Sequence, residues 1–213
     1  SICLGFGIYF SIKSVSSPKA SFDSCFKTII DFGYVFEHLI LSLTKHDFGT
    51  CWLGGTFKRQ HYRKDLNENE IIPAISPVGY KASKRRLIER IIRKAAQSPT
   101  RLPFSVLFKN YYDLTNLEYN LNNPIISALD LVRRGPSASN KQPWRAYVEE
   151  NIIHFYIERT PNYPGKAFKY DIQALDMGIA LCHFEVGLKH FKKEISYFTA
   201  QNTLEIPNNE YVV

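Results

Sequence analysis

The chain has 213 residues, enough for one domain with a sizeable core. Its 45% hydrophobic and 14% aromatic content excludes a disordered chain, and no apolar run reaches the roughly 18 residues of a membrane span. The net charge of +7 suits nucleic acid, but it also suits a phosphorylated small molecule, so charge alone does not choose between these classes of partner.

The N-terminus and the cysteines bear on processing and location. The opening SICLGFGIYFSIK is apolar but has no leading basic segment and no clear cleavage site, so we expect no signal peptide. The chain lacks an initiating Met, which predicts a fragment or a trimmed product. The four cysteines are scattered, without a CxxC pair or a His at ligand spacing. They predict reduced, mostly buried thiols in a cytoplasmic protein and no metal site.

A strand and a long helix are predicted first. Residues 7–15 are rich in β-branched and aromatic side chains, as in a strand. Between residues 22 and 46, apolar residues recur three and four apart, which predicts a central amphipathic helix. A glycine inside a helix costs about 1 kcal/mol relative to alanine. Gly33 therefore indicates close packing of another backbone or of a ligand at this point.

The helix is expected to end at Asp47-Phe48-Gly49, where the sequence GTCWLGG begins. We call residues 49–55 the glycine segment. Its glycines permit tight turns and the close approach of backbone to a ligand. A glycine C-cap followed by a short strand explains the same residues without a ligand. The charged residues 58–70 then predict a solvated loop or short helix.

A basic helix is predicted over residues 84–97, with Ser83 as a candidate N-cap. Apolar residues share one face and basic residues the other. Such a helix can bind membranes or acidic partners, or it can be a core helix with a solvated basic face. Lys84, Arg85 and Arg86 near its beginning are candidate phosphate ligands, because a helix N-terminus adds free amides to their charge.

Residues 98–123 are polar and loop-like, with aromatic residues that can belong to the core, to an interface or to a surface that stacks bases. Apolar spacing over residues 125–134 predicts a helix that stops at Gly135-Pro136. The sequence GPSASNKQPW, which we call the amide loop (residues 135–144), follows. Its small residues leave backbone amides free to converge on an anion, and its Asn and Gln can bond a planar heterocycle. An ordinary polar turn is the alternative.

The C-terminal part predicts two strands, at residues 146–148 and 152–159, and a Pro/Gly loop over residues 159–166. Residues 171–191 predict a second amphipathic helix, and residues 194–213 contain strand-like pieces.

Both named stretches resemble motifs of the nitroreductase family. The amide loop is similar to the family's signature (A/G)PSAxNxQPW, which contacts FMN, and the glycine segment is similar to a second motif whose amides meet the flavin ring. The strand-like IIPAISPVGY at residues 71–80 resembles the strand after which basic residues reach the FMN phosphate. The motif order, GTCW before PSASNKQPW, resembles a smaller nitroreductase subfamily. The family's N-terminal Arg-x-Ser-x-Arg motif is absent, and we expect that this chain starts after it.

The resemblance implies an α+β three-layer fold, a mostly antiparallel sheet flanked by helices, in one domain over residues 1–213. It also implies an FMN-dependent oxidoreductase that takes a hydride from NAD(P)H and reduces a nitroaromatic, quinone or similar small acceptor, as a homodimer. Neither nucleic acid nor membrane is then an expected partner, and no protein side chain is an expected catalyst because the flavin performs the chemistry. The implied FMN-binding residues are Gly49, Thr50, Cys51, Lys84, Arg85, Arg86, Pro136, Ser137, Ala138 and Asn140.

Two other functions stay open on the sequence. One is a non-catalytic module that binds nucleic acid or acidic partners through residues 81–101, where eight Lys or Arg residues stand against one Glu. The other is a flavin-binding protein without turnover.

Overall fold

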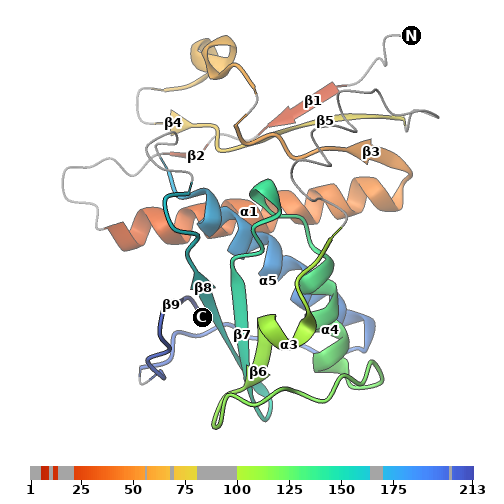
Figure 1. Cartoon of the computed structure of the whole chain (residues 1–213). Coiled ribbons are helices and arrows are strands. Elements are labelled where there is room, and N and C mark those ends of the chain that lie inside the picture. The colour runs from red at the N-terminus through yellow and green to blue at the C-terminus, as the bar shows by residue number, and fades with distance from the viewer. Residues whose placement is uncertain are drawn as a thin grey trace.

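The computed structural model describes residues 6–9, 12–13, 22–55, 57–67, 70–80, 100–163, 170–201 and 203–213. Its strands are β1 (Phe6–Tyr9), β2 (Ile12–Lys13), β3 (Phe48–Thr50), β4 (Glu70–Ile71), β5 (Ile75–Tyr80), β6 (Phe108–Asn110), β7 (Trp144–Glu149), β8 (Ile152–Glu158) and β9 (Asn209–Tyr211). Its α-helices are α1 (Phe22–Lys45), α3 (Phe104–Leu107), α4 (Pro124–Arg134) and α5 (Ile172–His190), and its 3-10 turns are η1 (Arg59–Asp65) and η2 (Ala138–Asn140). Figure 1 shows their arrangement.

The crossing of α1 and α5 forms the centre of the molecule (Figure 1). A Cβ atom built on Gly33 of α1 would lie 2.3 Å from the carbonyl oxygen of Leu175. A Cβ built on Gly178 of α5 would lie 2.0 Å from the carbonyl oxygen of Ile30. Neither space holds a side chain, so the two glycines let the helix backbones touch. This confirms the prediction that Gly33 marks a close backbone contact.

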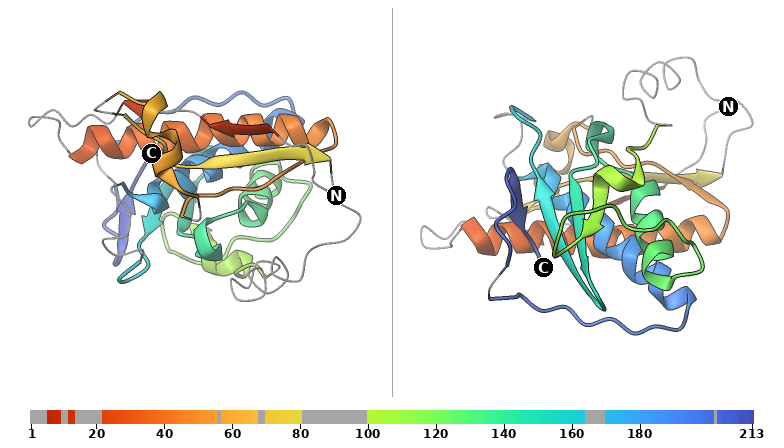
Figure 2. Two further views of the ribbon diagram at one scale, coloured as in Figure 1. Left: turned by 90° about the horizontal axis from the view of Figure 1, so that it is seen from above. Right: turned by 60° about the horizontal axis from the view of Figure 1, so that its bottom comes forward.

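Strands lie on both sides of this helix pair (Figures 1 and 2). The antiparallel sheet β1-β5-β3 packs through β3 on α1, and the pair β2-β4 is separate from it. The sheet β6-β7-β8-β9 contacts α5 through β7 and β8, and β6–β7 is its parallel pair. The predicted α+β class and the mostly antiparallel pairing are thus confirmed. The described strands form separate sheets instead of the single sheet that was predicted.

Helix α5 corrects one prediction, because it is buried on almost every side and is not amphipathic. Helix α1 covers one face, and α4 covers another so closely that a Cβ on Gly187 would lie 2.7 Å from the Cα of Ala128. Phe155 of β8 packs edge-to-face on Phe184, with 5.3 Å between ring centres. The N-terminus of α5 was predicted correctly, since the side chain of Asp171 accepts hydrogen bonds from the amides of the first turn.

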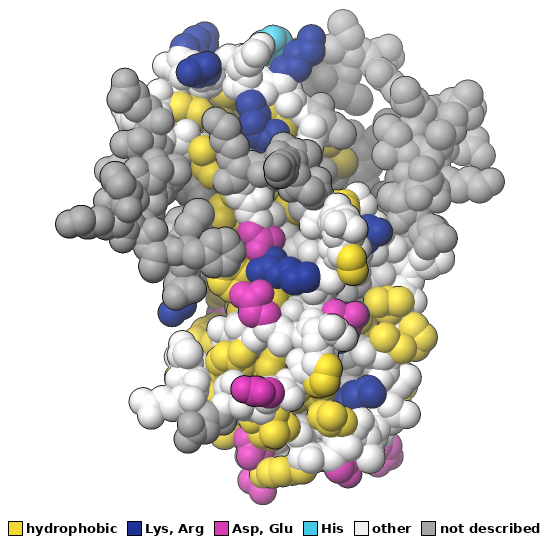
Figure 3. Space-filling model, turned by 60° about the vertical axis from the view of Figure 1, so that its left-hand side comes forward, with side chains coloured by type: hydrophobic (Ala, Val, Ile, Leu, Met, Phe, Trp, Pro, Cys, Tyr) yellow, Lys and Arg dark blue, Asp and Glu magenta, His cyan; other side chains and the backbone are white. Residues whose placement is uncertain are grey.

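Several other boundaries differ from the predictions. The predicted strand over residues 7–15 is two short strands with different partners, β5 for β1 and β4 for β2. Residues 98–123 contain α3 and β6, and β9 is the strand that the structure shows within the described residues of 194–213. Within the charged stretch at residues 58–70, Arg59–Asp65 forms a short solvated helix, η1, as predicted. Lys and Arg side chains gather over it at the top of Figure 3. The predicted basic helix lies outside the described residues.

None of the helices in the described ranges is long and apolar enough to cross a membrane.

We predict that Gly33→Ala destabilises the protein. Alanine is a better helix former than glycine by about 1 kcal/mol. The new methyl group would nevertheless meet a backbone oxygen that no rotamer change can move, and such overpacking costs about 1–3 kcal/mol. We therefore expect a lower midpoint in urea unfolding followed by circular dichroism. Val35→Ala, on the exposed face of the same helix, should change the midpoint little. An unchanged midpoint in Gly33→Ala would contradict the close crossing.

Candidate functional site

The glycine segment begins as an edge strand. Gly49 and Thr50 lie in β3 and pair with Gly79 and Val78 of β5. The amide of Cys51 donates to the hydroxyl oxygen of Ser76 at 3.0 Å. Because β3 is the last strand of its sheet as described, the backbone groups on its other side do not pair with β5. The segment therefore combines amides already bonded within the protein with others that face away from the sheet.

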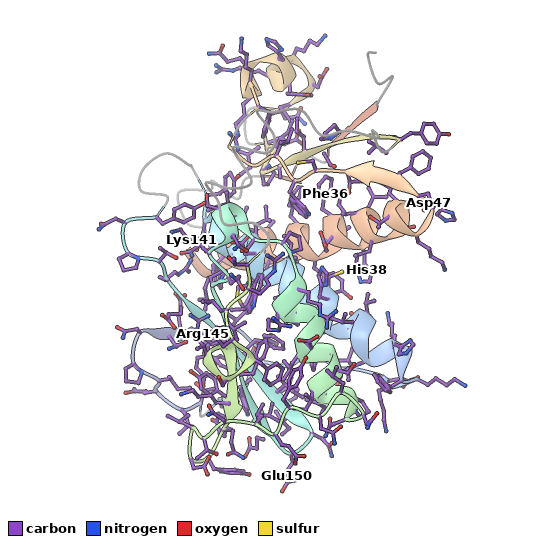
Figure 4. The ribbon with its side chains drawn as sticks, turned by 45° about the vertical axis from the view of Figure 1, so that its right-hand side comes forward. Phe36, His38, Asp47, Lys141, Arg145 and Glu150 are labelled. Carbon is purple, nitrogen blue, oxygen red and sulfur yellow. The ribbon has the colours of Figure 1, made fainter. Side chains whose placement is uncertain are left out.

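Trp52 ties the glycine segment to helix α1. Its indole Nε1 donates to Oε2 of Glu37 at 2.7 Å, and its ring packs edge-to-face on Phe36 with 4.7 Å between ring centres. Phe36 is fully buried, and Glu37 is 2% exposed. Figure 4 labels Phe36 on α1, and Asp47 just before the glycine segment. The position of Trp52 is thus fixed by one polar and one aromatic contact.

Glu37 also reaches helix α5. Its other carboxylate oxygen, Oε1, lies 2.8 Å from Nε2 of His183. The His183 ring in turn lies near the start of the amide loop, because a Cβ atom built on Gly135 would be 3.5 Å from its Cδ2 atom and 3.6 Å from its Nε2 atom. Two hydrogen bonds to Glu37 therefore link the glycine segment to a ring on α5 that lies near the start of the amide loop.

The amide loop folds back on itself. The amide of Gln142 donates to the hydroxyl oxygen of Ser137 at 2.9 Å, and Ser139, Asn140 and Gln142 adopt positive φ angles. That contact uses the oxygen of Ser137 as an acceptor, so its O–H group is still a donor. Tyr163 covers the loop by donating to the Ser139 hydroxyl at 2.9 Å. Burial raises the pKa of Tyr163, so its hydroxyl stays protonated as a donor.

The amide side chains of the loop hold a neighbouring segment. Asn140 donates through Nδ2 to the carbonyl of Thr100 at 3.0 Å and accepts through Oδ1 from Arg101 at 3.1 Å. Gln142 is buried, and its Oε1 accepts from the amide of Leu102 at 2.9 Å. Residues 100–102 follow directly after the basic stretch at residues 81–99. The loop therefore holds residues 100–102 in place.

Arg101 is a residue that sequence reasoning missed as part of the site. Its guanidinium donates to the carbonyl of Arg134 in the last turn of α4, at 3.1 Å and 3.3 Å, and to Asn140. This places a positive charge beside the amide loop. In the sequence it is only the last basic residue of the run at residues 81–101, which gives no sign of this contact.

Asp176 of α5 lies directly beneath the loop. Its Oδ1 atom accepts from the amide of Ala138 at 2.9 Å, and its Oδ2 atom is buried with no hydrogen-bond partner among the described residues. Burial raises the pKa of this carboxyl well above its ordinary value, and the hydrogen bond from Ala138 opposes the rise. The indole Nε1 of Trp144, at the end of the loop, is likewise buried without a partner in the described structure.

The structure thus brings part of the predicted site together. Gly49, Thr50 and Cys51 belong to the segment whose Trp52 is linked through Glu37 to His183, and the His183 ring lies near the start of the loop that contains Pro136, Ser137, Ala138 and Asn140. Lys84, Arg85 and Arg86 lie outside the described residues. Two cavities of about 430 Å³ and 180 Å³ are lined by other residues, from α1, α5, β8 and the C-terminal segment.

Comparison with known proteins places this arrangement in a family. The family model described as "Putative TM nitroreductase" matches residues 20–188, which include both named stretches and the contacts between them. The chain belongs to this nitroreductase family. Among solved structures, this nitroreductase-family chain is similar to the crystal structure of a putative nitroreductase from Thermotoga maritima. The TM-score is 0.54 and the identity 20%, over 92% of this chain and 73% of that chain. At this identity the likeness shows the fold. No curated protein matches the sequence.

We predict that Asp176→Asn changes the pH dependence of stability. A carboxyl whose pKa is raised by folding binds a proton in the folded state at pH values where the unfolded chain has lost it. The stability that it contributes is complete below the ordinary aspartate pKa of about 4 and falls as the pH rises towards the raised value, by up to about 1.4 kcal/mol per pH unit. The free energy of unfolding of wild type should therefore fall relative to that of Asp176→Asn as the pH rises above about 4.

Denaturant unfolding at several pH values measures this difference. Asp176→Ala should lose the same pH dependence and be less stable than Asp176→Asn, because it also removes the acceptor for the Ala138 amide. A constant difference between wild type and Asp176→Asn across the pH range would contradict the assignment.

Proposed function

We propose that this nitroreductase-family chain is an FMN-dependent oxidoreductase. It would use NAD(P)H as the reductant and a nitroaromatic, a quinone or a similar small molecule as the acceptor. Family membership over residues 20–188 supports the oxidoreductase class. The cofactor is proposed from the residues around the two named stretches, and the reductant and the acceptor from the resemblance of those stretches to nitroreductase motifs.

One observation carries the proposal. The two stretches that resemble flavin-contacting motifs are far apart in the sequence, yet both rest on the same crossing of α1 and α5. Trp52 of the glycine segment bonds to Glu37, and Gly135 of the amide loop lies near His183, which bonds to the same carboxylate. A fold that used these stretches only as turns would not require them to share a buried polar group.

The donor groups around the amide loop fit a phosphorylated flavin. Ser137 offers a hydroxyl donor, Arg101 brings a positive charge, and the outer backbone groups of β3 lie beyond the sheet. Hydroxyl and amide groups suit a ribityl chain and a heterocyclic edge, while guanidinium and ammonium groups suit a phosphate. The amide of Cys51 is the least suited of the proposed ligands, because Ser76 already accepts its hydrogen bond.

The role of each residue follows from its chemistry. Ser137 and Asn140 would hold the ribityl chain and ring, with Pro136 and Ala138 shaping the loop, and the outer amides near Gly49 and Thr50 would face the reacting edge. Lys84, Arg85 and Arg86, outside the described residues, would neutralise the phosphate. The chemistry that FMN supplies when bound is hydride acceptance from NAD(P)H and electron transfer to the acceptor. The protein binds, orients and shields, and we propose that it does so as a homodimer.

An absorbance scan of the purified protein, before and after reconstitution with FMN, tests the proposal. We expect a flavin spectrum that NADPH or NADH bleaches and that an added quinone or nitroaromatic restores. If neither nucleotide bleaches the flavin, the result would favour a flavin-binding protein without turnover over an enzyme. Protein that takes up no FMN but binds nucleic acid with a steep salt dependence would favour the binding module at residues 81–101.

We predict that reversing the charge of Lys84, Arg85 and Arg86 to Glu weakens FMN binding. Each lost charge-assisted phosphate contact costs on the order of 1.5–3 kcal/mol, which is about ten- to a hundredfold in affinity. The dissociation constant, measured by flavin fluorescence, should rise by at least about tenfold. Glu substitutions at the exposed Lys192 and Lys193, after α5, change the net charge as much as the double Arg85→Glu, Arg86→Glu variant does and are its control. Equal effects of the two sets of substitutions on the FMN dissociation constant would mean that FMN binding depends only on the net charge of the protein.

A further inference from the structure

We infer that Glu37 is a positioning residue of the proposed flavin site, and that its carboxylate couples the glycine segment to the amide loop. This inference rests on the proposed function, because the flavin would lie between the two stretches. Glu37 itself would contact neither the cofactor nor the substrate. It would act through Trp52 on one side and His183 on the other.

The first half of the coupling is the contact with Trp52. The indole N–H can only donate, and Oε2 of Glu37 is its acceptor at 2.7 Å. Trp52 follows Cys51 directly, so the orientation of its ring fixes where the glycine segment leaves β3. The edge-to-face contact with Phe36 holds the same ring from a second side. Loss of the carboxylate would leave this ring without its hydrogen-bond acceptor, held by apolar packing alone.

The second half is the contact with His183. A carboxylate accepts at both oxygens, so Glu37 can hold the imidazole N–H at 2.8 Å while it holds the indole. The His183 side chain is 14% exposed, and a Cβ atom built on Gly135, where α4 ends and the amide loop begins, would be 3.5 Å from its ring. The ring therefore limits the space on this side of the start of the amide loop, and its hydrogen bond to Glu37 fixes where that limit lies.

Burial of the Glu37 carboxylate costs more free energy than is expected of a group that serves only to stabilise the fold. A carboxylate that is 2% exposed loses its hydration, and well-packed apolar residues of similar volume often stabilise a protein as much or more. Both of its bonds go to residues that adjoin the two proposed cofactor-binding stretches. The arrangement is explained if the carboxylate fixes the distance between those stretches.

The molecule contains a matched control. Glu149 and His154 form a second Glu–His pair at 2.9 Å, and the His154 ring stacks on Tyr111 with 4.1 Å between ring centres. This pair joins the adjacent strands β7 and β8, and neither member contacts the glycine segment or the start of the amide loop in the described structure. A substitution there removes the same kind of hydrogen bond without touching the proposed coupling.

The experiment compares Glu37→Leu, Glu37→Gln and Glu149→Gln. We expect Glu37→Leu to raise the FMN dissociation constant by about tenfold or more, because both stretches lose their common anchor. Glu37→Gln keeps one acceptor oxygen for the indole and should restore most of the affinity. Glu149→Gln should leave the dissociation constant within about twofold of wild type even where it lowers the melting temperature. Equal FMN affinity in all the proteins, or a loss that tracks the melting temperature in both pairs, would overturn the inference.

Hydrogen exchange separates this inference from the proposed function. A wild-type protein that binds no FMN would defeat the proposed function, but the coupling would still be decided by amide exchange without ligand. Glu37→Leu should speed exchange in both residues 49–55 and residues 135–142, and Glu149→Gln in neither. Faster exchange in only one stretch would overturn the coupling. If Glu37→Leu does not fold, Trp52→Phe, which removes only the indole donor, should still speed exchange in both stretches, and faster exchange in residues 49–55 alone would overturn the coupling.

Discussion

The contact between the backbones of α1 and α5 determines how the rest of the molecule is arranged. Side chains at Gly33 and Gly178 would force the helices apart, since both would meet backbone atoms well inside van der Waals distance. Glu37 lies four residues after Gly33 and therefore on the same side of α1. The close crossing brings its carboxylate within 2.8 Å of His183 on α5. The polar link between the two motif-bearing stretches thus depends on two missing side chains.

Local sequence patterns were sufficient to predict those elements that are determined by residues within the same segment. The apolar spacing of residues 22–46 predicted α1 to within one residue, and Asp171 marked the start of α5 because its cap bonds are to the next turn. The burial of α5 could not be read in this way. Its Gln173, Asp176 and Glu185 are residue types that usually face solvent, but each is buried, and each has a partner at least 13 positions away in the sequence. Periodicity reports which residues share a face, not what covers that face.

In the candidate site, too, local sequence predicted some features and missed the contacts between distant residues. The two motifs located the glycine segment and the amide loop, and family membership agrees with them. They did not show that Asn140 and Gln142 bond to residues 100–102, or that Ser76 accepts from the amide of Cys51, because these contacts join residues 25 to 40 positions apart. Arg101 and Glu37 were missed for the same reason. The ligand roles of the ten predicted residues remain predictions, and three of them lie outside the described structure.

Buried acidic groups on the helix pair strengthen the case that the two stretches form a site. Glu37 and Asp176 are each at most 2% exposed, and each forms a hydrogen bond with one of the stretches, through Trp52 and Ala138. Apolar residues at these positions would avoid the cost of removing a carboxyl group from water. One oxygen of Asp176 and the indole nitrogen of Trp144 are buried without partners among the described residues. In a well-packed protein, such local conflicts between polarity and burial concentrate where function constrains the sequence. Two of the three such atoms among the described residues border the amide loop, while the third, Oδ1 of Asn209, lies in β9, so most of this constraint falls beside the amide loop.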